Sequence, residues 1–112
     1  DFHMTEHDVV RALSALAQHS RLQIFRQLVV AGNAGMTPTQ IATTLGLAST
    51  GLSFHLKELA HAGLITQERD GRNLIYRAAF APMNEVLRFL TLNCCEGQSC
   101  ELTAVAAPCE NC

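Results

Sequence analysis

The sequence has no acidic residue between Asp8 and Glu58, although its net charge is −2. The same stretch carries basic residues, namely Arg11, Arg21, Arg26 and Lys57. The last nineteen residues show the reverse pattern, because they hold three glutamates and no base. A basic front and an acidic tail favour a phosphate-facing surface in the first half of the chain.

The chain also lacks an apolar run near the roughly 18–20 residues that a membrane-spanning helix needs. Its first residues do not show the charged-then-apolar pattern of an export signal. We therefore expect a cytoplasmic protein with no membrane partner, and its 112 residues are enough for one small domain. Residues 1–7 are expected to form an N-terminal segment, in which the three residues before Met4 resemble a tag remnant.

Cysteine is absent from the first 93 residues, and all five cysteines follow in the tail: Cys94, Cys95, Cys100, Cys109 and Cys112. Thiols this close together react with one another and with soft metals. An odd number of clustered cysteines without an export signal indicates reduced, ligand-binding thiols more than a disulfide framework. We therefore interpret residues 94–112 as a cysteine-rich sensing tail.

Apolar residues recur at helical spacing in five segments of the chain. A first helix is predicted over 8–18, and a second begins after an N-cap at Ser20. Pro38 opens a third helix, and a fourth starts near residue 49 and closes at Gly63. A fifth helix begins at Pro82 and runs into the cysteines.

The period changes between the fourth and fifth helices. Residues 64–68 and 73–77 read as two strands, and Asp70-Gly71 between them is a strong hairpin-turn signal. The predicted order is therefore α-α-α-α-β-β-α. This is a mainly α fold with a β-hairpin wing, a winged helix-turn-helix.

The third and fourth helices, joined by a tight turn that contains glycine, suggest a DNA-reading unit. Such a unit presents polar and basic side chains outward for phosphates and base edges, and the hairpin tip adds cations. A solvated helix face would show similar residues. The predicted DNA-binding residues are Thr39, Gln40, Ser49, Thr50, Ser53, His55, Lys57, Arg69 and Arg72.

Three segments together resemble the ArsR (ArsR/SmtB) repressors. Residues 51–65, GLSFHLKELAHAGLI, resemble their recognition-helix block, and residues 13–25 are similar to the entry of their second helix. Asp70-Gly71-Arg72 with the following Ile75-Tyr76-Arg77 resembles their wing. The resemblance covers about residues 8–93 and implies a homodimeric repressor that leaves its double-stranded operator DNA when an inducer binds. It implies a dimer interface on the first and last helices, here Val10, Leu13, Ala17, Val86, Leu87 and Leu90.

Members of that family place metal ligands at different positions. Some members carry cysteines on the helix that corresponds to residues 39–45, which here contain no ligand-type side chain. Others pair Asp with His on the last helix, where residues 82–93 here offer only Glu85. Cys94, Cys95 and Cys100 instead resemble the C-terminal three-cysteine site of an arsenic-responsive subgroup. Because As(III) and Sb(III) are thiophilic and favour three ligands in a pyramid, they are the expected inducers. The expected function is an arsenite- or antimonite-responsive transcriptional repressor.

Two alternatives use the same thiols differently. Cys109 and Cys112 form a Cys-x-x-Cys pair that, with Cys100 and one of the adjacent cysteines, gives a four-thiolate site for zinc, cadmium or lead. Otherwise that pair is a tail dithiol. A disulfide from Cys94 or Cys95 to Cys100, which is less strained than a bridge between the two adjacent cysteines, would instead make the protein a redox sensor. An arsenate-reducing enzyme is disfavoured, because no arginine follows the thiols to cradle an oxyanion. We therefore predict that the chain is not an enzyme.

Overall fold

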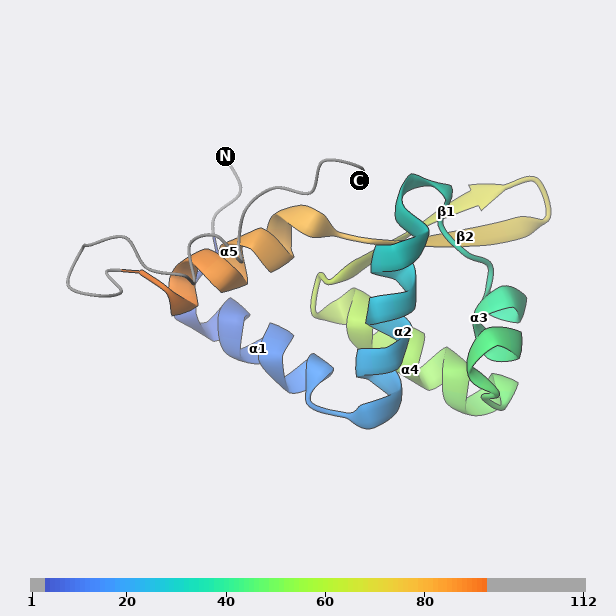
Figure 1. The fold of residues 1–112 in the computed structure, drawn as a ribbon, viewed down its shortest axis with the longest axis horizontal. Helices are drawn as coiled ribbons and strands as arrows, with labels where there is room; N and C mark the ends of the chain where they lie inside the picture. Colours follow the sequence, from blue (N-terminus) through green and yellow to red (C-terminus); the bar gives the residue numbers. More distant parts are fainter. Residues whose placement is uncertain (1–3, 93–112) are drawn as a thin grey trace.

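The computed structural model describes residues 4–92. Within this range the chain order is α-α-α-α-β-β-α, as predicted, with one short 3-10 turn added after the second helix. The elements are α1 (Glu6–Leu16), α2 (His19–Ala31), η1 (Gly32–Ala34), α3 (Pro38–Leu45), α4 (Ser49–His61), β1 (Ile65–Asp70), β2 (Asn73–Ala78) and α5 (Phe80–Leu90). Figure 1 shows α1 and α5 at one end of the molecule, and α3 and the hairpin at the other.

The core gathers around α2, which contacts α1, α3, α4 and β2. Ile24 and Leu28 of α2 have no exposed surface. Each large apolar side chain buried in this way contributes about 1.5–3 kcal/mol relative to an exposed one. The largest fully buried side chains come from four helices and the α4–β1 connection, and are Ile24, Leu28, Ile41, Leu59, Leu64 and Val86. The reading elements and the terminal helices are therefore built on one core.

The first two helices begin earlier than the sequence predicted. Thr5 caps α1 in a reciprocal capping box with Asp8, so this helix starts at Glu6 and ends at Leu16. The α2 helix starts at His19 because the side chain of Gln18 accepts a hydrogen bond from the N–H of Arg21. Ser20 is therefore inside the helix, and its prediction as the N-cap was wrong. The glutamine amide oxygen performs the capping role that serine usually has.

The ends of α3 follow the prediction. Thr37 and Gln40 form a capping box, Pro38 is the first helical residue, and Gly46 ends the helix in the left-handed region at φ 67°. The α5 helix instead begins at Phe80, two residues before Pro82. Proline is tolerated there because the first N–H groups of a helix have no intrahelical acceptor.

The two strands form an antiparallel hairpin that pairs Asp70 with Asn73, so Gly71 and Arg72 make the turn. Gly71 has φ 64°, the positive value that tight hairpin turns require. Met36 in the α2–α3 connection pairs with Tyr76 through two backbone hydrogen bonds of 2.9 and 2.8 Å. The hairpin is therefore tied to the helical core through its second strand.

Gly35 permits this close approach. A Cβ atom at Gly35 would lie 2.6 Å from Cγ2 of Ile75 and 2.7 Å from the carbonyl oxygen of Tyr76. Its φ of 67° also lies where side chains are disfavoured. Among the residues described, no helix is long and apolar enough to cross a membrane.

Candidate nucleic-acid interface

The α4 helix has one apolar and one polar side. Leu52, Leu56 and Leu59 point into the core and are at most 4% exposed. Their spacing of three and four residues places them on one helical face. Ser49, Thr50, Ser53 and Lys57 are all exposed, as a base-reading helix requires. The hydroxyl of Ser53 donates to the carbonyl of Ser49 at 3.2 Å, and it keeps its lone pairs for an outside partner.

The turn between α3 and α4 fixes the angle of the polar face. Gly46 adopts the left-handed conformation, and the N–H of Leu47 donates to the carbonyl of Ala42 at 3.1 Å. Thr39 and Gln40 are both exposed on α3. The amide oxygen of Gln40, however, accepts from the N–H of Thr37 at 2.9 Å. Only the amide NH₂ of Gln40 is therefore left to donate to an outside acceptor.

His55 lies differently from the other predicted contact residues of α4. It is half-buried, and its Nδ1 lies 3.4 Å from Nη1 of Arg21 on α2. Burial, and then the charge of Arg21, lower the pKa of His55. A neutral ring can accept from the guanidinium at Nδ1, whereas a protonated ring cannot. His55 thus faces α2 and supports the placement of α4.

Phe54 takes the exposed position beside His55. Its side chain is 56% exposed, and its ring meets the imidazole edge-on at a centroid distance of 5.7 Å. The sequence prediction did not include Phe54 in the reading surface. An exposed phenylalanine on this helix adds an apolar group that can meet a thymine methyl.

The wing carries cations at its tip and an anchor at its base. Arg69 and Arg72 are exposed, and neither makes a side-chain hydrogen bond or ion pair within residues 4–92. Arg77 was not among the residues predicted from the sequence. Its Nη1 lies 2.7 Å from Oε1 of Glu68, in a salt bridge. Its Nε donates to the carbonyl of Asn33 at 2.7 Å. Arg77 therefore ties the hairpin to η1 and leaves the tip cations available.

The α1 and α5 helices contact each other and present an exposed apolar face. Its large members are Val10 at 56%, Leu13 at 39%, Leu90 at 57% and Leu92 at 55% exposure. Ala17 is exposed beside them, and Leu87 is half-buried. Val86 was wrongly placed on this face, because it is only 2% exposed and belongs to the core of the protomer. Leu92 was not predicted and extends the face beyond α5.

Comparison with known proteins agrees with this geometry. A family profile described as a helix-turn-helix domain matches residues 16–68. The transcriptional regulator NmtR of Mycobacterium tuberculosis is 35% identical over 68 residues, which are 61% of this chain and 54% of NmtR. A solved ArsR-like transcriptional regulator from a Rhodococcus species superposes with a TM-score of 0.71 at 27% identity, covering 88% of this chain and 90% of that one. The chain is similar to ArsR-family regulators in both sequence and fold.

Two further relatives extend the comparison within the ArsR family. A Halobacterium salinarum protein named for the arsenical resistance operon repressor ArsR is 35% identical over 63 residues, 56% of this chain and 48% of that protein. A homodimeric winged helix-turn-helix DNA-binding domain from Mycobacterium bovis superposes with a TM-score of 0.64 at 26% identity, covering 84% of this chain and 87% of the other. The matched region spans about half the length of the curated relatives.

The predicted thiol ligands lie outside the described residues. They are Cys94, Cys95 and Cys100, with the second pair Cys109 and Cys112. Between residues 4 and 92, no group of three or more His, Cys, Asp or Glu side chains could hold a metal ion. The three-cysteine site is therefore a prediction from the sequence.

Proposed function

We propose that the chain is a transcriptional repressor that binds operator DNA as a homodimer and is released by a trivalent metalloid. The observation that carries the DNA-binding part is the exposed polar side of α4, Ser49, Thr50, Ser53 and Lys57, opposite a leucine side in the core. A helix presented in this way can enter the major groove while its other face stays packed.

Lys57 of α4 and the flanking elements supply the phosphate contacts in this proposal. Thr39 and the amide NH₂ of Gln40 approach the backbone from α3, and Arg69 and Arg72 approach from the wing. Contacts of this kind set the register of a protein on DNA, whereas side chains that reach base edges set its sequence preference. The base-edge contacts are assigned to Ser49, Thr50, Ser53 and Phe54 at the N-terminal half of α4.

The exposed apolar face of α1 and α5 is the proposed dimer interface. A two-fold dimer brings the same patch from both protomers together and gives two reading helices for a near-palindromic operator. Val10, Leu13, Leu90 and Leu92 supply the large apolar contacts. One protomer alone makes few phosphate contacts, and DNA affinity rises steeply with their number.

The proposed inducer is As(III) or Sb(III), held by the thiolates of Cys94, Cys95 and Cys100. Soft metalloids favour thiolate ligands, and binding releases protons from the thiols. Cys94 follows Leu92 by two residues, so the sequence connects the ligand site directly to the proposed dimer face. The name of the Halobacterium relative gives independent support for an arsenical inducer. By linkage, the metalloid must bind the DNA-free dimer more tightly by the factor with which it weakens DNA binding.

A second candidate inducer follows from the Cys-x-x-Cys pair near the end of the chain. Cys109 and Cys112, with Cys100 and one of the adjacent cysteines, provide the four thiolates of a tetrahedral zinc, cadmium or lead site. This candidate requires both tail cysteines, whereas the metalloid site requires neither.

Serine substitutions separate the two candidates. Cys94→Ser, Cys95→Ser or Cys100→Ser should each abolish arsenite induction of a promoter reporter while repression persists. The matched control Cys109→Ser/Cys112→Ser should respond normally to arsenite. Normal induction in Cys100→Ser would contradict the three-thiolate site, and loss of response in the tail variant would favour the four-thiolate site.

A further inference from the structure

A polar hollow lies between α1, α2 and α4. Its volume of about 550 Å³ falls in the range of small-molecule sites. Its polar lining consists of Arg11, Ser14, Arg21, Glu58 and His61, and two alanines complete it. None of these residues has a place in the proposed DNA contacts or the thiol site.

Arg21 is held in place before any ligand arrives. Its Nε donates to the carbonyl of Ala15 at 2.7 Å, and its Nη1 lies 3.4 Å from His55. This leaves the Nη2 group without a hydrogen-bond partner within residues 4–92. A guanidinium fixed in this way loses little conformational entropy when it binds a carboxylate.

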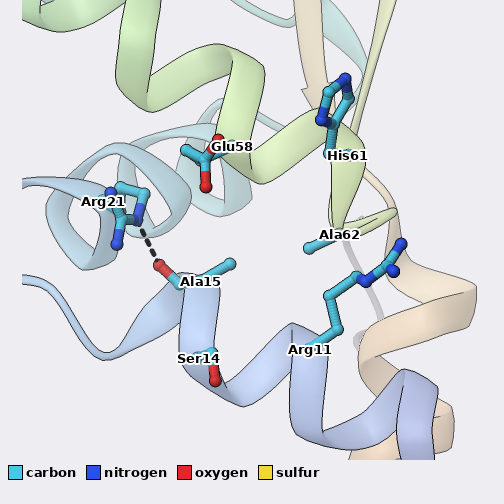
Figure 2. A pocket seen from close by; sticks show the side chains of 7 residues that line it. All are labelled: Arg11, Ser14, Ala15, Arg21, Glu58, His61 and Ala62. Carbon is cyan, nitrogen blue, oxygen red and sulfur yellow. Dashed lines mark hydrogen bonds between the residues drawn. The ribbon is translucent and has the colours of Figure 1, made fainter.

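The other charged groups of the hollow keep their bonding capacity. In the part of the chain that the structure describes, the side chains of Arg11, Glu58 and His61 form no hydrogen bond or ion pair. Figure 2 shows the guanidinium groups of Arg11 and Arg21 on opposite sides of the hollow. The carboxylate of Glu58 lies between them in this view. In this view the charged groups run from positive through negative to positive.

We propose that this hollow binds a small dicarboxylate that carries an amino group. One carboxylate pairs with Arg11, whose guanidinium can form two parallel hydrogen bonds, and the other accepts from the remaining Nη2 group of Arg21. The ammonium group pairs with Glu58. Two guanidiniums and one carboxylate leave one positive charge, which matches the single negative charge of an amino dicarboxylate.

The hollow borders the proposed dimer face on α1. Successive residues of a helix are rotated by about 100°, so Arg11 lies on another side of α1 from Val10 and Leu13, whereas Ser14 lies one turn after Val10 on the same side. Because its lining comes from three helices, an occupied hollow would hold α1 at a fixed distance from α4. The binding itself does not depend on the proposed repressor function and can be measured without DNA.

Isothermal titration of the full chain at constant ionic strength tests the proposal with three probes. L-glutamate has all three charged groups, glutarate lacks the ammonium, and L-glutamine lacks one carboxylate. L-glutamate should bind more tightly than either matched compound. Arg11→Gln should weaken L-glutamate binding about tenfold or more, whereas Arg26→Gln, a change at an exposed arginine elsewhere on α2, should leave it unchanged.

Glu58→Gln provides a second variant with a distinct expected result. Removing this carboxylate should erase the preference for L-glutamate over glutarate, because the ammonium loses its partner. Circular dichroism confirms folding of each variant. The proposal is overturned if L-glutamate gives no saturable heat with the wild-type chain, if glutarate binds equally well, or if Arg26→Gln and Arg11→Gln have equal effects.

Discussion

Leu90 offers a quantitative test of the proposed dimer, because it is 57% exposed in the protomer. Full burial of a leucine side chain is worth about 1.5–3 kcal/mol. Burying the exposed 57% should therefore contribute about 0.9–1.7 kcal/mol per protomer, and twice that in a symmetric dimer. Alanine keeps one of the four side-chain carbons, so Leu90→Ala should lose about three quarters of the total, about 1.3–2.6 kcal/mol.

This loss corresponds to a rise of about 8- to 70-fold in the dimer dissociation constant. Sedimentation equilibrium over a range of protein concentrations measures it directly. Val30→Ala is the matched control, because Val30 is 74% exposed on α2 and lies outside the α1–α5 face. An unchanged dissociation constant in Leu90→Ala, or an equal rise in Val30→Ala, would refute the assignment of this interface.

Three further perturbations test other parts of the account. Lys57→Gln should weaken binding to all DNA sequences. It should also reduce the slope of log K against log salt concentration by about 0.9 per lost phosphate contact, hence about 1.8 for a dimer, as measured by anisotropy at several salt concentrations. An unchanged slope would remove Lys57 from the phosphate contacts. His55 has its pKa lowered from the ordinary 6.5, so the unfolded chain takes up a proton first as the pH falls. The contribution of neutral His55 to the free energy of unfolding should therefore be fully present above about pH 6.5 and should be lost as the pH falls below it. Urea titrations should show that His55→Gln lacks this decrease. Gly35→Ala should cost more than the roughly 1–3 kcal/mol of positive-φ backbone strain alone, since its Cβ would meet the carbonyl oxygen of Tyr76 at 2.7 Å. Gly32→Ala, which has open space, should cost about that amount in thermal unfolding. Equal losses in the two glycine variants would refute the close-packing argument.

Much of the fold could be predicted because local signals coincided with tertiary packing. The Thr37–Gln40 capping box and Pro38 start α3, and the glycine after Asp70 supplies the positive φ of the hairpin turn. The N-terminus of α2 was missed because glutamine is an unusual cap. The residues at helix ends and in the turn therefore explain why α3 and the hairpin were predicted correctly and why the start of α2 was not.

The orientation of individual side chains was harder to predict. Periodicity marks Val86 and Leu90 alike as apolar on α5, although one is 2% and the other 57% exposed. Which of them faces the core depends on how α5 lies against α1, and no local pattern encodes that packing. For His55 the sequence did hold a signal, because it lies three residues after Leu52 and four before Leu59, on the flank of the buried side.

Arg77 could not be selected as an anchor from its own strand. Its partners, Glu68 and the carbonyl of Asn33, come from β1 and η1. Arg77 pairs with Thr66 in the hairpin register, so Glu68 is a diagonal neighbour. A contact of this kind becomes visible only when the register and the path of the α2–α3 connection are both known.

The most direct test of the central claim is fluorescence anisotropy of the reduced protein on its own promoter DNA, titrated separately with arsenite and with zinc. The account predicts tight binding by the dimer and release by arsenite, with about three thiols consumed per protomer. Release by zinc alone, with four thiols consumed, would contradict the metalloid site and make Cys109 and Cys112 essential. Failure of the apo-protein to bind its promoter would contradict the repressor function itself.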